Sequence, residues 1–245
     1  MIKILKNFIY ILTTLFIVVI VIFSFKNNSS PIKEIVINSE NKFLDRYRIE
    51  SLITEKMGKD SIIKNADIIE KNILANPFVK EIKLYQDLSN KLIVDLVQYQ
   101  PIARLVFENK KDFYIDLHGN IFPTSTKFSE RVLLIHTDDN INYDLKNINS
   151  TDYGKKIFTM INYIINDTFL SKIISEIDIN YDKNIIIYPQ VSKQKIIFGY
   201  PEQIDVKFDK LMLFYKKVLP AKGWNTYKTV NLKFKNQIIC DKKVW

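Results

Sequence analysis

The sequence predicts an α+β fold: an N-terminal transmembrane helix, a small unit with the order β-α-α-β-β, and a β-rich domain with a few helices. Three observations lead to this prediction. An uncharged run occupies residues 8–25. Helical and strand patterns then alternate over about 70 residues. Beyond Pro101, short strand patterns separated by turn sequences dominate, which is typical of a β-rich domain.

The uncharged run 8–25 is the candidate membrane anchor. As a helix it would be about 27 Å long, close to the hydrocarbon thickness of a bilayer. Lys3 and Lys6 precede it and favour a cytoplasmic N-terminus, although Lys26 weakens the asymmetry. A cleaved signal peptide is the alternative, but the run is longer than a signal core of about 7–15 residues and ends without a small-x-small pattern. We expect a retained anchor in membrane lipid, with residues 1–7 as a short cytoplasmic tail.

A polar linker at residues 26–31 leads into the small unit, residues 32–101. Its strand and helix patterns are separated by N-cap, glycine and proline signals. The expected elements are a strand at 32–38, a helix at 45–57, a helix from about Asn65 to Asn76, and strands at 79–85 and 91–98. Two helices that cover one face of a three-stranded sheet would satisfy this order.

The remaining residues, 102–245, form the predicted β-rich domain. Strands are expected at 103–108, 113–116, 131–136, 174–180, 185–188 and 195–198, with helices at 152–166 and about 205–219. The chain then ends in a predicted hairpin with strands at 227–235 and 237–241 and a turn at Asn236. A terminal hairpin leaves a sheet edge, and an edge can accept a strand from a partner.

Positive charge is concentrated near the C-terminus. The net charge is +9, and residues 205–245 hold ten lysines and three aspartates, so 10 − 3 = +7 lies in this segment. Such a segment can attract an acidic protein or anionic lipid. The alternative is a solvated lysine face on ordinary elements. Nucleic acid is not expected as a partner, because the anchor places this region outside the cytoplasm.

Few residues point to catalysis. Cys240 is the only cysteine, which excludes an intrachain disulfide, and no glycine-rich phosphate loop is present among five glycines. Asp116 and His118 lie two apart on a predicted strand and could begin a metal site, but no third ligand is evident. A strand that ends in a Gly-Asn hairpin turn is the simpler interpretation. We therefore expect no enzyme activity, no cofactor, no metal and no small-molecule substrate.

Several motifs, taken in order, resemble the FtsQ/DivIB family of bacterial cell-division proteins. The first runs from Asn76-Pro77-Phe78-Val79 through the strand at 79–85. The second is Lys91-Leu92-Ile93-Val94-Asp95-Leu96-Val97 with the exit Gln100-Pro101-Ile102-Ala103. The others are Tyr114-Ile115-Asp116-Leu117-His118-Gly119-Asn120-Ile121-Phe122, similar to the family's Y-I-D-x-x-G-x-x-F, and Val230-Asn231-Leu232-Lys233-Phe234, similar to its late V-D-L-R-Y strand.

The resemblance implies a single-pass protein of the bacterial cytoplasmic (inner) membrane, with a POTRA domain at 32–101 and the family's β domain at 102–245. It implies a non-enzymatic divisome scaffold at the division septum, with the bulk of the chain in the periplasm. The implied partners are the bitopic proteins FtsB and FtsL, and the implied role is regulation of septal peptidoglycan synthesis. In the family, FtsB adds a strand to the last strands of the β domain. Carried over by position, the contact residues are Asn231, Lys233, Phe234, Gln237 and Ile239.

Three positions depart from the family pattern. Asn231 stands for the usual Asp, Phe234 for Tyr, and Lys233 for Arg, which removes the bidentate fork of a guanidinium. The alternative function is that of another POTRA-bearing protein, such as an outer-membrane assembly or secretion factor. Those proteins carry a transmembrane barrel or repeated POTRA units, and one unit followed by about 145 residues leaves too little chain for a large barrel.

Overall fold

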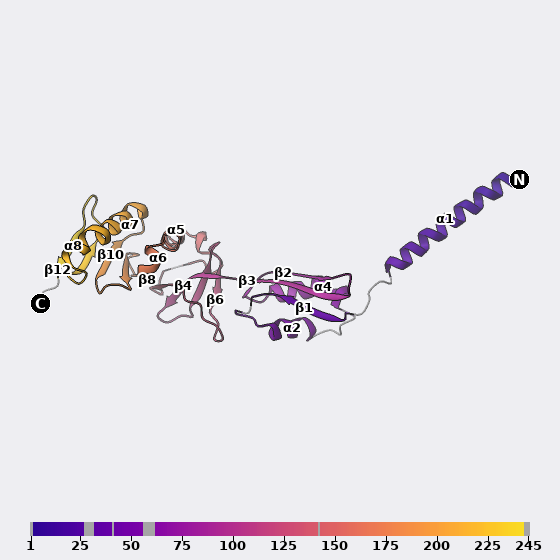
Figure 1. Cartoon of the computed structure of the whole chain (residues 1–245), viewed down its shortest axis with the longest axis horizontal. Coiled ribbons are helices and arrows are strands. Elements are labelled where there is room, and N and C mark those ends of the chain that lie inside the picture. Colours follow the sequence, from indigo (N-terminus) through magenta and orange to yellow (C-terminus); the bar gives the residue numbers. More distant parts are fainter. Residues whose placement is uncertain (1, 27–31, 41, 56–61, 142, 243–245) are drawn as a thin grey trace. The chain divides into compact units, whose positions relative to one another are not determined.

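The computed structural model of the chain describes residues 2–26, 32–40, 42–55, 62–141 and 143–242 (Figure 1). These residues divide into two compact units, with the division between Gln98 and Tyr99. The first unit holds α1 (Ile2–Lys26), β1 (Glu34–Asn38), α2 (Arg46–Thr54), the 3₁₀ turn η1 (Ile63–Asn65), α4 (Ala66–Leu74), β2 (Val79–Gln86) and β3 (Lys91–Gln98). The order β-α-α-β-β predicted for residues 32–98 is confirmed.

Helix α1 covers the predicted anchor. Its described side chains run from Tyr10 to Ile22, and the large apolar ones among them are between 46% and 69% exposed. Measured over the part of the chain that the structure describes, no helix combines the length and the apolar character needed to cross a membrane. The anchor at residues 8–25 therefore stays a prediction.

In the first unit, β3 is the central strand of a three-stranded sheet. It pairs parallel with β1 and antiparallel with β2. Buried residues of the helices, including Ile49, Ile53 and Ile73, pack in one cluster with Leu92 and Val94 of β3. The predicted cover of two helices on one sheet face is thus confirmed. Leu74, the last residue of α4, is 46% exposed. Met57 and Gly58, the predicted end of the first helix, lie outside the described residues.

The second unit is built on a nine-stranded sheet in the order β12-β11-β10-β9-β8-β7-β4-β5-β6. Its strands are β4 (Pro101–Phe107), β5 (Phe113–Asp116), β6 (Ile121–Pro123), β7 (Leu133–Thr137), β8 (Ile174–Ile179), β9 (Ile185–Pro189), β10 (Lys195–Gly199), β11 (Tyr227–Asn231) and β12 (Ile239–Lys242). The mixed α+β character with one large sheet and few helices agrees with the predicted fold class.

Helices cover one face of this sheet. They are η2 (Ile148–Ser150), α5 (Asp152–Asn166), α6 (Leu170–Ile173), α7 (Ile204–Leu213), the π-helical segment η3 (Phe214–Val218) and α8 (Leu219–Lys222). Buried side chains of α5 and α7, such as Ile157, Ile161 and Phe208, pack in one cluster with Ile177 and Ile187 of the sheet. On the opposite face, which we call the outer face, the alternate residues of β4, β7 and β9 are half-buried.

The sheet mixes strand directions that the sequence patterns do not distinguish. The predicted Gly-Asn turn is confirmed, since β5 and β6 form a hairpin with Gly119 at φ 80°. β8 and β9 form a second hairpin with Lys183 at φ 61°. However, β7 pairs parallel with both β4 and β8, and β10 pairs parallel with β11. Parallel neighbours require long crossover connections. The connections from β7 to β8 and from β10 to β11 contain the helices, whereas the connection from β4 to β7 contains the β5–β6 hairpin.

Candidate functional site

The candidate site is the last hairpin of the chain, β11 and β12. Val230 is fully buried, since it points into the helix-covered core. Thr229 pairs with Asp241, Val230 with Cys240, and Asn231 with Ile239. Because side chains alternate along a strand, Ile239 and Asp241 lie on the outer face while Cys240 packs against the core.

Strand β11 ends at Asn231, so the predicted strand 227–235 was wrong in its second half. The side chain of Asn231 accepts a hydrogen bond from the backbone N–H of Lys233 over 3.0 Å, which forms a turn at the end of the strand. The N–H of Leu232 still donates to the Ile197 carbonyl of β10 over 2.9 Å. Lys210 of α7 also donates from its Nζ to the carbonyls of Leu232, over 2.9 Å, and Phe234, over 2.8 Å. These carbonyls are therefore bonded to a helix side chain and are lost to strand pairing.

Two of the C-terminal lysines, Lys207 and Lys210, are inward structural groups, so a solvated lysine face does not describe these two. Lys207 is 5% exposed, donates to the carbonyl of Tyr200 over 2.8 Å, and lies 4.8 Å from the ring centre of Phe198. Burial lowers the pKa of Lys207 and also that of Lys210. The exposed lysines of this segment include Lys216 and Lys233.

The structure brings all five predicted contact residues into this one hairpin. Asn231 is half-buried at the end of β11, and Ile239, which is 41% exposed, lies opposite it on β12. Lys233, Phe234 and Gln237 occupy the connecting loop and are exposed, with Phe234 at 42%. The loop residues thus flank the edge strand, and only Ile239 belongs to it.

Sequence reasoning missed the residues that hold this loop in place. The stem of Lys233 crosses Gly199, where an added Cβ would come within 2.7 Å of its Cγ. Gly199 also has φ 77°, a conformation that favours glycine. The only local signals were a glycine after a strand and a lysine on the inner side of a helix pattern. Neither signal indicates the contact of Gly199 with Lys233 or that of Lys210 with Leu232, because each joins residues more than twenty positions apart in the chain.

The edge of β12 differs from the other sheet edges. The two sheets have four edge strands: β1, β2, β6 and β12. Arg46 donates to the Ile35 carbonyl of β1 over 3.4 Å, and Glu70 accepts from the Leu84 N–H of β2 over 2.6 Å. In β6, Ile121 donates to the carbonyl of Lys146, and the last residue is a proline.

By contrast, no hydrogen bond from elsewhere in the described residues reaches the outward backbone of β12. Unpaired backbone groups on an edge strand form a template for another strand. The site can therefore bind an extended chain by backbone pairing.

The lone cysteine, Cys240, sits at the centre of this edge strand. Burial raises the pKa of its thiol, with a smaller contribution in the same direction from the Asp241 carboxylate. The neutral thiol then behaves as a small apolar side chain.

Asp116 and His118 form a turn. Asp116 is 3% exposed, and its carboxylate accepts hydrogen bonds from the backbone N–H groups of His118 and Asn120 and from the Asn120 side chain. Its acceptor sites are thereby committed to the Gly-Asn hairpin. Within the described residues, no group of three or more His, Cys, Asp or Glu side chains could hold a metal ion.

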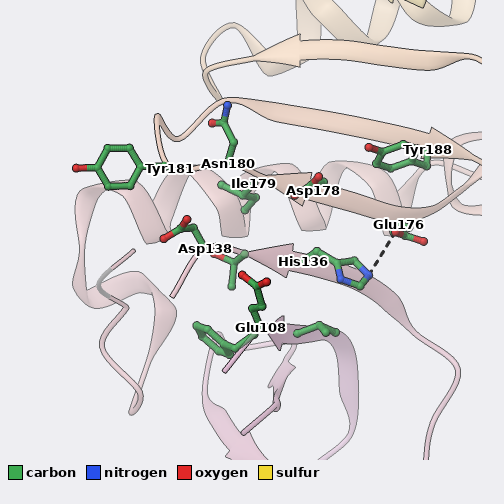
Figure 2. Close-up of a pocket in the computed structure, with 12 residues that line it drawn as sticks. Glu108, His136, Asp138, Glu176, Asp178, Ile179, Asn180, Tyr181 and Tyr188 are labelled. Atoms are coloured by element: carbon green, nitrogen blue, oxygen red, sulfur yellow. Dashed lines mark ion pairs between the residues drawn. The ribbon is translucent and has the colours of Figure 1, made fainter. Parts of the chain in front are cut away.

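A pocket of about 490 Å³ lies elsewhere in the second unit, near the ends of the parallel strands β4, β7 and β8 (Figure 2). Figure 2 shows the His136 side chain directed towards that of Glu176. His136 Nε2 lies 3.3 Å from Glu176 Oε1. Further acidic groups at its wall are Glu108, Asp138 and Asp178. The carboxylates give this part of the sheet a negative charge, in contrast with the lysine-rich hairpin.

Comparison with known proteins bears on the second unit. The sequence model of the family described as FtsQ/DivIB, C-terminal related matches residues 100–241. This range begins at β4 and ends within β12, so it spans the whole nine-stranded sheet and the candidate site. A search of the curated proteins finds no match.

Proposed function

The chain belongs to the FtsQ/DivIB, C-terminal related family, and on that premise we propose that it is a non-enzymatic scaffold of the division site. Family membership indicates a role in cell division through contacts with other proteins at that site. The scaffold binds FtsB-like and FtsL-like bitopic proteins and helps to regulate septal peptidoglycan synthesis. The family match favours this function over that of an outer-membrane assembly or secretion factor.

The open edge of β12 is the observation that carries the proposal. A partner segment adds to it as a tenth strand and pairs its backbone with residues 239–242. On each of the other three edge strands, one backbone group is bonded from outside its sheet: Ile35 by Arg46, Leu84 by Glu70, and Ile121 by the Lys146 carbonyl. Because strand addition depends on unpaired backbone groups, β12 is the favoured acceptor among the described strands.

The predicted contact residues supply the side-chain part of this interface. Phe234 and Ile239 offer apolar surface beside the edge, and Lys233 offers positive charge in the loop. Buried aromatic and aliphatic anchors provide much of the affinity of such interfaces, whereas surrounding charges guide association and orientation. A partner segment with apolar residues beside the edge and an acidic residue near the loop fits this surface.

We further propose that residues 8–25 of α1 anchor the chain in the cytoplasmic membrane, and that residues 32–101 form a POTRA domain. The exposed apolar side chains of α1 and the β-α-α-β-β order support these assignments. The large protein body then lies in the periplasm, where the partners' extended segments can reach it. Membrane fractionation tests the anchor, since recovery of the full chain without detergent in the soluble fraction would contradict it.

The binding test compares single substitutions in the full chain with wild type. Removing residues 230–245 would be uninformative, because Val230 and Leu232 are fully buried and the deletion would unfold the unit. Phe234→Lys and Ile239→Lys instead place a charge on side chains that are 42% and 41% exposed. Leu117→Lys is the matched control, since Leu117 is 58% exposed in the β5–β6 turn at the other end of the sheet order.

The FtsB-like protein from the same genome is the probe, measured by co-purification in detergent. Phe234→Lys and Ile239→Lys should lower its recovery at least tenfold, while Leu117→Lys should leave it unchanged. Equal recovery by all variants would move the interface away from the hairpin. Failure of the wild-type chain to bind the probe would refute the scaffold proposal.

A further inference from the structure

We propose that β12 selects its partner strand by charge, with Asp241 pairing to a Lys or Arg of the incoming strand. Apolar partner residues then lie opposite Ile239 and Cys240. The inference rests on the proposed strand addition and deepens it, because it names the chemistry of the strand that fits this edge.

The register of the hairpin determines which partner side chains meet which residues of β12. Ile239 and Asp241 point to the outer face, next to Asn231 and Thr229 of β11. Cys240 points to the core side, next to Val230. Since side chains directly opposite each other on neighbouring strands interact, an added strand places one residue against each of these positions.

Asp241 is the one carboxylate of the hairpin, which also contains Lys228, Lys233, Lys235 and Lys242. Its Oδ2 accepts a hydrogen bond from the hydroxyl of Thr229 on the neighbouring strand β11. A carboxylate has about four acceptor sites, so the side facing the open edge retains capacity. Among the described residues Asp241 has no ion-pair partner.

The neighbours of Asp241 on the outer face indicate which partner side chain would suit this position. The cross-strand row that ends at Asp241 runs inward through Thr229 to Lys195. Lys195 Nζ lies 5.7 Å from the ring centre of Tyr188, so the cation of the row is engaged away from Asp241. A basic residue on the next strand outward is the complement that this acidic end position lacks.

The neighbouring positions call for apolar partners. The row that ends at Ile239 continues through Asn231 to Ile197 and Ile186, which gives it two aliphatic side chains. On the core side, the neutral thiol of Cys240 packs against the apolar cluster. The partner segment therefore carries one basic residue two positions from an apolar residue on the same face, with another apolar residue between them.

Charged residues on edge strands can also serve simply to prevent unwanted pairing. On that alternative, any charge at position 241 would protect the edge, and the identity of the partner's residue would not matter. The two readings differ in one respect: only a specific pair can be rescued by exchanging the charges.

The experiment uses the full chain in detergent and the FtsB-like protein from the same genome. Asp241→Asn should weaken binding about threefold and Asp241→Lys about tenfold, as expected for loss and then reversal of a partly exposed pair. Thr229→Val is the control, because it removes the hydroxyl partner of Asp241 and keeps the carboxylate. Each Lys or Arg of the probe is then changed singly to Glu and tested against Asp241→Lys.

One of these probe variants should restore binding to Asp241→Lys while binding the wild-type chain poorly. Added salt should shrink the difference in affinity between the wild-type chain and Asp241→Asn. If Asp241→Lys binds as tightly as wild type, or if no charge exchange restores binding, the inference is overturned. If the charge exchange fails but Phe234→Lys still weakens binding in the same assay, only the charge inference is overturned and the scaffold proposal stands. If the wild-type chain does not bind the probe, both the charge inference and the scaffold proposal are overturned.

Discussion

Replacing Lys210 with Met should destabilise the second unit by releasing the loop that follows β11. The ammonium of Lys210 donates to the Leu232 carbonyl, in a half-buried position, and to the Phe234 carbonyl, which is exposed. Hydrogen bonds from charged groups contribute about 1.5 kcal/mol or more each. Solvent competes for the exposed bond, so we expect a loss of about 2 kcal/mol in the free energy of unfolding.

Burial moderates this loss. It lowers the pKa of Lys210, which means that the folded state disfavours the charge, and methionine removes that cost. For a unit of this size, about 2 kcal/mol corresponds to a decrease of about 4–8 °C in the unfolding midpoint. The substitution should also weaken partner binding, because the loop that carries Phe234 loses its support.

Urea unfolding followed by tryptophan fluorescence measures the effect. Trp224 packs against Tyr215, with ring centres 5.9 Å apart, so its emission reports on this part of the unit. Lys216→Met is the matched control, because Lys216 is exposed and follows in the same run of helix. A stability of Lys210→Met within about 0.5 kcal/mol of the control, the range of ordinary surface substitutions, would refute the reasoning.

Two further predictions concern stability at alkaline pH and the edge strand β2 of the first unit, where Glu70 binds the Leu84 N–H. Burial raises the pKa of Tyr143 to about 12, so its contribution to stability is complete below pH 10 and is lost as pH rises towards 12, a loss of about 3 kcal/mol. Tyr143→Phe should flatten that alkaline decline in thermal scans, and an unchanged decline would exclude this residue as its cause. Glu70→Leu removes the acceptor of the Leu84 N–H and should cause concentration-dependent self-association through β2 in size-exclusion chromatography. Glu81→Leu, on an exposed position of the same strand, should stay monomeric; identical elution of the two variants would count against the guarding role of Glu70.

Local patterns were enough to predict elements whose cause is local. The helix at 152–166 was predicted with its exact bounds, because its apolar residues repeat at helical spacing and end at a polar stretch. The hairpin turns at Gly119 and Lys183 were predictable for the same reason, since turn chemistry depends on a few adjacent residues.

Features with distant causes were not predictable in this way. The end of β11 depends on Lys210, which lies about twenty residues earlier in the chain, and the close passage of Lys233 depends on Gly199. The pairing directions of β7 and β10 depend on where helices return the chain, which strand patterns do not record. The candidate contact residues came from the family resemblance, and their binding role stays a prediction.

The parallel pairing of β10 with β11 has a consequence for the timing of assembly. The two strands are joined through α7, η3 and α8, so this helical crossover has to return the chain along the sheet for β11 to pair with β10. β12 in turn pairs with β11, and both strands follow the other seven strands of this sheet along the chain. The edge of β12 therefore depends on the helical crossover that places β11. A partner that requires this edge would recruit finished molecules and ignore incomplete ones, which makes the order of folding itself a checkpoint for assembly.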